Sequence, residues 1–170
     1  MTHVYCGDGK GKTTCAMGLA LRCAGRGGRV TVAQFLKNGD SGERYALKDM
    51  ERVALLPVAE VTKFVFQMTD EEKRQLAEKM AALFEQATGM VRRGECDMLV
   101  LDELCSAITT GMVSLDTVIS FLDEEHGAEI VITGRDPAQA LIDRADYVTE
   151  MRKVKHPYDK GQPQRKGVEW

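Results

Sequence analysis

The stretch Gly7-Asp8-Gly9-Lys10-Gly11-Lys12-Thr13-Thr14 lies near the start of this 170-residue chain and decides its predicted fold. It follows the apolar run His3-Val4-Tyr5-Cys6, which is typical of a buried strand, and precedes a run rich in Ala, Leu and Met that predicts a helix from Lys12 to Ala24. A glycine-rich loop between a strand and a helix presents backbone N–H groups and the positive end of the helix to a ligand. The stretch therefore predicts a phosphate-binding loop, or P-loop.

The side chains of this loop suit a nucleoside triphosphate, most simply MgATP. Lys12 can place an ammonium group between phosphates, and the Thr13 hydroxyl can ligate Mg²⁺. The pattern departs from G-x-x-x-x-G-K-[ST], because Cys6 stands where the first glycine is expected. The loop that begins at Gly7 is one residue shorter, so the usual placement of the lysine on the β and γ phosphates does not transfer directly. A plain glycine-rich turn with a solvated lysine fits the strand–helix context poorly.

The rest of the chain alternates between strand and helix signals. Apolar, β-prone runs recur at residues 29–34, 98–102 and 129–133, and their continuous hydrophobicity is typical of strands covered on both faces. We predict an α/β fold of the P-loop NTPase (RecA-like) type, with a mainly parallel sheet, helices on both faces and three layers. The predicted helix starts are a capping box at Thr69-Asp70-Glu71-Glu72 opening a helix to Arg93, a Ser114 cap for Leu115 to Glu125, and an Asp136 cap before Pro137.

Two segments interrupt this order. Residues 36–44 read as a mobile loop, and residues 60–68, which contain Phe64 and Phe66, fit neither the helix nor the strand period. Residues 1–170 are expected to form one domain, because this length builds one core of ordinary size.

The composition of the chain limits which binding partners and which cellular compartment are expected. The chain has 23 basic and 26 acidic residues and a formal charge of -3, which argues against a nucleic-acid or anionic-membrane partner. Its five cysteines contain no C-x-x-C pair, as expected for reduced thiols, and no apolar stretch approaches the length of a membrane span. The chain enters its first strand at once, with no signal peptide pattern, so a cytoplasmic protein is expected.

Two further motifs follow apolar strands. Asp102 and Glu103 end the run Met98-Leu99-Val100-Leu101, at the sheet edge where open α/β sheets bind ligands, and either carboxylate can hold Mg²⁺. Arg135 follows the strand at 129–133 and can reach phosphate oxygens. An ordinary surface arginine is an equally good interpretation of Arg135.

Together these motifs resemble the P-loop ATP:corrinoid adenosyltransferases, also described as cob(I)yrinic acid a,c-diamide or cob(I)alamin adenosyltransferases. The resemblance extends over nearly the whole chain, and the short loop is itself a mark of that family. It rests on the loop 7–14, Gln34-Phe35-Leu36-Lys37, Val100-Leu101-Asp102-Glu103-Leu104, Ile132-Thr133-Gly134-Arg135, Val154-Lys155-His156-Pro157-Tyr158 and the ending Gly167-Val168-Glu169-Trp170.

The resemblance implies an unusual reaction, in which a cobalt(I) corrinoid attacks the 5′ carbon of ATP and expels tripolyphosphate. The nucleotide would lie reversed along the loop, with the phosphates as leaving group. Lys12, Thr13 and Glu103 would be catalytic, with Thr13 and Glu103 nearest Mg²⁺ and Asp102 supporting. The nucleotide-binding residues would be Gly7, Asp8, Gly9, Lys10, Gly11, Lys12, Thr13, Thr14, Arg22 and Arg135.

The same resemblance assigns Phe64 and Phe66 to the corrinoid, where they would displace its lower axial ligand and ease reduction to cobalt(I). The family often has Trp where this chain has Phe66, and two core phenylalanines are the alternative interpretation. A flavoprotein reductant and a homodimer are implied. Lys155, His156 and the rest of the tail from Arg152 would close over the site or meet the second subunit. Many relatives carry an N-terminal extension before the first strand, which this sequence lacks, so the covering role of the tail would be more important or product release faster.

Two other functions stay open at this point. One is a conventional small P-loop kinase or ATPase, which would act on the γ phosphate. The other is a non-catalytic ATP-binding regulatory subunit that uses Phe64 and Phe66 as a protein contact. The choice among cobalamin, cobinamide and an a,c-diamide as acceptor is not decided by the sequence.

Overall fold

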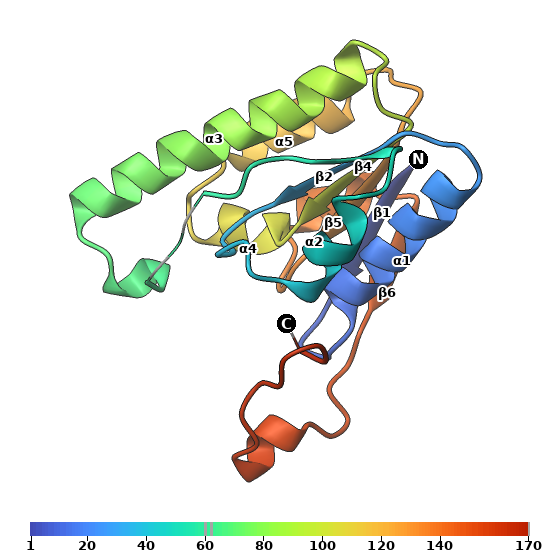
Figure 1. Ribbon diagram of the computed structural model, residues 1–170. Coiled ribbons are helices and arrows are strands. Elements are labelled where there is room, and N and C mark those ends of the chain that lie inside the picture. Colours follow the sequence, from blue (N-terminus) through green and yellow to red (C-terminus); the bar gives the residue numbers. More distant parts are fainter. Residues whose placement is uncertain (60, 62, 170) are drawn as a thin grey trace.

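A parallel sheet organises the computed structural model, which describes residues 1–59, 61 and 63–169 (Figure 1). Within these residues the sheet has six strands in the order β3-β2-β4-β5-β1-β6, and all its pairings are parallel. The four strands expected from the apolar runs are present. The strands are β1 (Thr2–Cys6), β2 (Val30–Gln34), β3 (Val53–Leu55), β4 (Met98–Asp102), β5 (Glu129–Thr133) and β6 (Tyr147–Glu150).

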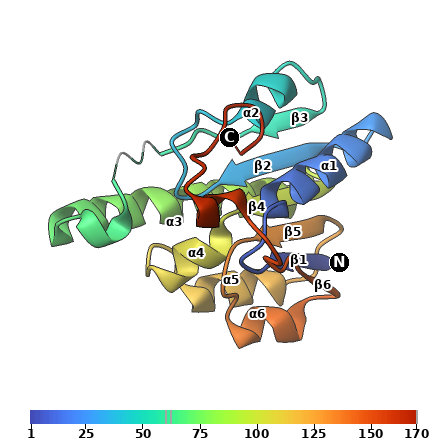
Figure 2. The same cartoon turned by 90° about the horizontal axis from the view of Figure 1, so that it is seen from below.

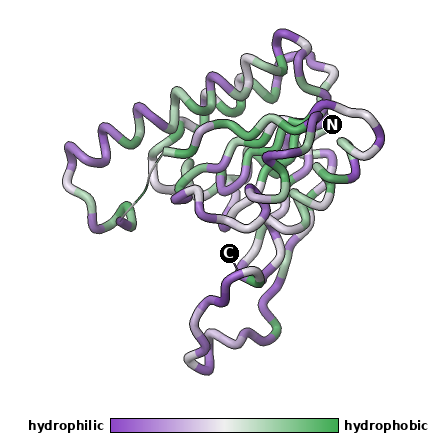
Figure 3. Tube along the Cα trace, viewed as in Figure 1, coloured by the Kyte–Doolittle hydropathy of each residue, from purple (hydrophilic) through white to green (hydrophobic). Residues whose placement is uncertain are grey.

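Helices cover both faces of this sheet, because successive strand residues point to opposite sides. Leu99 and Leu101 pack on the face covered by α3 (Asp70–Arg92), α4 (Leu104–Thr109), α5 (Leu115–Leu122) and α6 (Gln139–Arg144). Val100 and Val131 pack on the other face, under α1 (Lys12–Gly25) and α2 (Gly42–Leu47). Figures 1 and 2 show these layers, and Figure 3 shows hydrophobic residues concentrated in the sheet. The predicted α/β fold with three layers is confirmed.

The long helix α3 begins where its capping box predicts. The Thr69 hydroxyl accepts a hydrogen bond from the Glu72 N–H at 3.2 Å, and the Glu72 carboxylate accepts one from the Thr69 N–H at 2.8 Å. Two backbone donors that the first turn would leave unpaired are thereby satisfied. The Ser114 hydroxyl caps α5 by accepting a hydrogen bond from the Thr117 N–H at 3.5 Å, although α5 ends at Leu122 rather than at the predicted Glu125.

Other local predictions are wrong. Asp136 does not cap α6, which begins at Gln139 after Ala138; Asp136 itself has a left-handed φ of 47° and belongs to the turn after β5. Residues 42–44 of the predicted loop belong to α2. The short elements β3, β6 and α4 were not predicted, because runs of three to six residues give little periodic signal.

The irregular segment before α3 forms the 3₁₀ helix η1 (Val65–Gln67), while Glu60 and Thr62 of this segment lie outside the described residues. After β6 the tail extends from the body of the molecule, forms the 3₁₀ helix η2 (Pro157–Lys160), and turns back toward the glycine loop (Figure 1). Within the described residues, no helix combines the length and apolarity needed to cross a bilayer.

Candidate functional site

The segments that follow the parallel strands begin at the carboxyl edge of the sheet, where open α/β sheets bind ligands. They include the glycine loop after β1 and the segments that follow β2, β4, β5 and β6. Parallel pairing places Gln34, the last residue of β2, beside Asp102, the last residue of β4. Polar residues that end neighbouring strands are thereby brought to one place.

The glycine loop wraps into the start of α1 with its lysine folded back over it. Gly11 has a φ of 114°, a left-handed conformation that glycine adopts without strain, and it stands at the N-cap of α1. The Lys12 ammonium donates a hydrogen bond to the Gly9 carbonyl at 2.7 Å and is nearly buried. Burial lowers the pKa of Lys12, with the Glu103 carboxylate opposing that shift. A buried cation of this kind is poised to gain a phosphate partner.

The chain after β6 packs directly on this loop. The Gly9 N–H donates to the Met151 carbonyl at 2.6 Å, and the Lys153 N–H donates to the Asp8 carboxylate at 2.9 Å. The second bond lowers the pKa of Asp8. A Cβ at Gly9 would lie 2.6 Å from the Met151 carbonyl oxygen. The glycine at position 9 is therefore required by the close approach of the chain after β6, a contact that no local sequence pattern predicts.

Asp102 is the centre of a polar group that we call the Asp102 cluster, in which Gln34, Asp102 and Thr133 are buried and Thr13 and Lys37 are half-buried. Asp102 is 0% exposed, and each of its oxygens accepts two hydrogen bonds. Oδ1 accepts from the hydroxyls of Thr13 at 2.8 Å and Thr133 at 2.7 Å. Oδ2 accepts from the Gln34 amide at 3.0 Å and the Lys37 ammonium at 2.6 Å. A fully hydrogen-bonded, ion-paired carboxylate can remain charged without water.

Glu103 stands next to this cluster but faces the cleft. Its backbone has a left-handed φ of 62°, and its N–H donates to the Thr133 hydroxyl at 2.9 Å. Ser106 donates to its carboxylate at 2.7 Å. A strained conformation held by its neighbours is common at functional sites, and here it directs the second acid of the pair away from the core. Glu103 thus has free acceptor capacity that Asp102 lacks.

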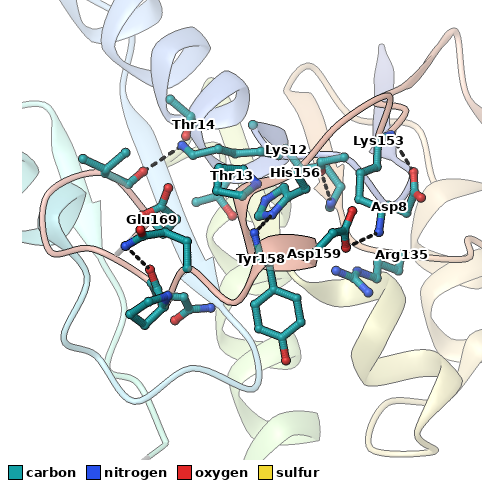
Figure 4. A pocket seen from close by; sticks show the side chains of 18 of the residues that line it. Asp8, Lys12, Thr13, Thr14, Arg135, Lys153, His156, Tyr158, Asp159 and Glu169 are labelled. Carbon is teal, nitrogen blue, oxygen red and sulfur yellow. Dashed lines mark hydrogen bonds and ion pairs between the residues drawn. The ribbon is translucent and has the colours of Figure 1, made fainter.

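A cleft of about 750 Å³ lies between the glycine loop and the tail. Figure 4 shows residues of the tail, among them His156 and Asp159, lining this cleft together with Lys12 and Thr13 of the loop. The Lys10 ammonium donates to the Val168 carbonyl at 2.7 Å and so ties the returning tail to the loop. The lining residues include Asp8 to Thr14, Glu103, Arg135, Lys153, His156, Tyr158, Asp159, Gln164 and Glu169.

A second cleft continues from the loop toward the irregular segment. Thr13, Thr14 and Lys37 line it at one end, and Phe64 lines it at the other. Phe64 and Phe66, which we call the Phe pair, are 70% and 79% exposed, and their rings stack with centroids 5.5 Å apart. The interpretation of these rings as core residues is wrong, since large aromatic rings are rarely left this exposed without a ligand or partner.

Arg22 does not join the other predicted site residues. It lies in the last turn of α1, ten residues beyond Lys12, which is about 15 Å along a helix. It lines neither of the two clefts described above. Its assignment to the nucleotide stays a prediction. Arg135, by contrast, lines the first cleft with the glycine loop.

Gln34, Lys37 and Thr133 had no predicted role, although all three belong to motifs quoted above. The signal that could have found Gln34 and Thr133 is the one that found Asp102, namely a polar residue ending an apolar strand. Lys37 lies three positions after Gln34, and nothing in its spacing predicts that its ammonium reaches Asp102 across the strand end.

Oxygen ligands for a divalent cation are present at the loop, because the Thr13 hydroxyl and the Glu103 carboxylate line the first cleft, with the Asp102 carboxylate behind them as the acceptor of the Thr13 proton. These residues fit Mg²⁺ as a partner to phosphate oxygens. Among the described residues, no three His, Cys, Asp or Glu side chains form a metal-binding group.

Comparison with known proteins identifies the family of this chain. Residues 1–170 match the family model described as ATP:corrinoid adenosyltransferase BtuR/CobO/CobP. Corrinoid adenosyltransferase CobA of Salmonella typhimurium is 36% identical over 169 residues, covering 98% of this chain and 84% of that protein. Corrinoid adenosyltransferases of Escherichia coli K12 and Pseudomonas aeruginosa are each 34% identical, covering 98% of this chain and 84% and 82% of their own lengths. The chain belongs to the ATP:corrinoid adenosyltransferase family.

Proposed function

We propose that this chain transfers the 5′-deoxyadenosyl group of MgATP to the cobalt(I) centre of a corrinoid and releases tripolyphosphate. The observation that carries the proposal is the shared wall of the two clefts. Thr13 and Thr14 line both the tail-covered cleft and the one that reaches Phe64. A phosphate chain on the loop and a large apolar ring on the Phe pair would therefore lie side by side.

The glycine loop would hold the triphosphate. Lys12 would turn from the Gly9 carbonyl to phosphate oxygens, and Lys10 and Arg135 would add positive charge at the rim. The Gly9 N–H already donates to Met151, so fewer loop amides remain for phosphate than in a longer P-loop. This supports a placement of the nucleotide that differs from the ordinary one, with the 5′ carbon directed toward the Phe pair.

The bond changes balance without an added acid or base. The cobalt(I) electron pair forms the Co–C5′ bond, the C5′–O bond breaks, and its electrons leave on the tripolyphosphate oxygen. Mg²⁺, held by Thr13 and Glu103 with Asp102 behind them, would supply charge stabilisation to that oxygen. Lys12 would act in the same direction, and the walls of the cleft would align the two substrates.

The Phe pair would bind the corrinoid face and exclude its lower axial base. Two stacked, exposed rings give a flat apolar surface next to Leu36 and Val65. Loss of an axial base makes cobalt(II) easier to reduce. The electron would come from an external reductant, for which we propose a reduced flavoprotein, and the working unit would be a homodimer.

Product identity tests the proposal. Purified protein, MgATP and chemically reduced cobalamin should yield tripolyphosphate and a light-sensitive alkylcobalt spectrum. ADP and phosphate as the only products would contradict it and support a conventional kinase or ATPase. Lys12→Ala should lower kcat/KM by about 100-fold or more, because a preorganised charge is lost. Lys10→Ala, a matched lysine that bonds the Val168 carbonyl, should have a smaller effect.

Rates with cobalamin, cobinamide and an a,c-diamide as acceptors would identify the preferred corrinoid. A double variant, Phe64→Ala with Phe66→Ala, that keeps full corrinoid affinity and turnover while losing a protein partner would favour a regulatory role instead.

A further inference from the structure

Lys37 lies where a divalent cation would contact the P-loop. Its ammonium is 2.6 Å from the Asp102 Oδ2 and 3.2 Å from the Thr13 Oγ1, and the Glu43 carboxylate is 3.8 Å away. In P-loop proteins the threonine hydroxyl and the acid at the end of a neighbouring strand are the groups that approach Mg²⁺. An amino group of the chain itself thus contacts both.

The hydrogen bonds show that Lys37 and a metal ion would compete for the same atoms. Thr13 donates its proton to the Asp102 Oδ1 and accepts from Lys37, so a lone pair that a metal would need is engaged. The Asp102 Oδ2 already accepts from Gln34 and Lys37. A carboxylate that is 0% exposed requires a counter-charge, and Lys37 supplies it.

Lys37 is also free to leave. Its side chain is 23% exposed, and it lines the cleft that contains Thr13 and Thr14. Lysine carries its charge on a flexible four-carbon chain, so the ammonium can turn from Asp102 toward a polyphosphate without a change in the strand. Asp102, held by four donors, cannot move in the same way.

We propose that Lys37 is an internal cation that excludes divalent metal ions from Thr13 and Asp102 until a polyphosphate arrives. When the polyphosphate binds, the ammonium moves to its oxygens, and Thr13 and Asp102 would become available to a divalent cation. This ordering rests on the proposed function for the identity of the polyphosphate. It goes beyond that function in assigning to Lys37 the control of metal entry.

Manganese binding to the protein without nucleotide tests the proposal. Mn²⁺, followed by the loss of its free-ion electron paramagnetic resonance signal, should bind the wild-type chain only weakly at this site. Lys37→Met should bind one Mn²⁺ per chain at least about tenfold more tightly, since Asp102 then lacks its counter-charge. Adding Asp102→Asn to Lys37→Met should remove the gain.

Two control variants show whether the effect on Mn²⁺ binding depends on the charge of Lys37 itself or on the loss of any lysine. Lys48→Met removes an exposed lysine that lies over the Tyr45 ring, and it should not change Mn²⁺ binding. Lys37→Gln removes the charge but keeps a hydrogen-bond donor, and it should gain Mn²⁺ as Lys37→Met does. Thermal melts establish that each variant is folded.

The wild-type measurement is decisive even if both Lys37 variants fail to fold. Tight, stoichiometric Mn²⁺ binding by the wild-type chain without nucleotide would overturn the proposal, as would an equal affinity in wild type and Lys37→Met. Failure of the proposed function can be told apart from failure of this proposal. The former would appear as an absence of adenosylation, whereas Mn²⁺ binding is measured without any substrate.

Discussion

The two ends of the second cleft are held in very different ways. At the loop end, Asp102 is 0% exposed and accepts four hydrogen bonds from residues on α1, β2, the segment after β2, and β5. At the other end, Phe64 and Phe66 are 70% and 79% exposed, on and beside the three-residue helix η1. The loop end is preorganised for charge, whereas the Phe pair is a surface that a large apolar ligand would complete.

The largest expected effect comes from breaking the buried end. Asp102→Ala would leave Lys37, Gln34 and two hydroxyls without their acceptor, and it should destabilise the protein by about 3–5 kcal/mol. Urea unfolding measures this change. Asp97→Ala, which removes an exposed acid that pairs with Arg29, is the matched control and should cost much less. Equal losses for the two variants would contradict the view that the Asp102 cluster stabilises the fold.

The buried end of the cleft was largely predictable from the sequence, because its residues end apolar strands. Asp102 and Thr133 end apolar strands, and continuous hydrophobicity identifies such strands, so the loop, the acid pair and the three layers were all predictable. The Lys37 contact and the Met151 approach to Gly9 join residues 65 and 142 positions apart. Such contacts depend on how strand ends meet in space, and no local pattern encodes them.

The exposed end was predictable only in part. Periodicity placed Phe64 and Phe66 outside any regular element, and the resemblance assigned them to a ligand, but neither predicted the stacking of the rings. Helix α2 and strand β6 were missed because they are short. Strand β6 lies at the sheet edge with all four residues exposed, so it lacks the apolar run that marks a buried strand.

A smaller effect is expected where the chain after β6 meets the glycine loop. Gly9→Ala would place a methyl group 2.6 Å from the Met151 carbonyl oxygen, and both atoms are fixed to backbone. We expect a loss of about 1–3 kcal/mol in stability, measured by thermal unfolding, together with weaker nucleotide binding. Gly18→Ala is the control, because a Cβ there meets no atom within 4 Å and the helix would tolerate it. A Gly9→Ala protein as stable as the wild type would show that the chain moves aside easily.

Removing the Phe pair should impair function while leaving the stability of the protein almost unchanged. The Phe64→Ala and Phe66→Ala double variant should lower kcat/KM for the corrinoid by about tenfold, or about 1.4 kcal/mol, through a higher KM. Its stability should change by less than about 0.5 kcal/mol, since exposed side chains contribute little. Phe84→Ala, at a buried ring that packs edge-to-face on Phe121, is the matched aromatic control and should lower stability instead. A double variant as unstable as Phe84→Ala would contradict the view that the Phe pair is a binding surface and not part of the core.

The smallest effect concerns the ion pair that joins the exposed end to α3. Lys63, next to Phe64, donates to the Glu72 carboxylate at 2.7 Å, and this bond lowers the pKa of Glu72 to about 2 from its ordinary 4.5. A carboxyl group whose pKa is lower in the folded than in the unfolded protein stabilises the fold at pH values above its unfolded-state pKa. That stabilisation is lost as the pH falls through the folded-state pKa.

Glu72→Gln keeps a residue able to form the capping box but removes the charge. Its melting temperature should therefore lie slightly below that of the wild type at neutral pH, and the two should converge as the pH falls from about 4.5 toward 2. High salt should narrow the same gap, because exposed pairs are screened. A gap that is unchanged by both acid and salt would mean that the Lys63–Glu72 pair does not hold the segment in place.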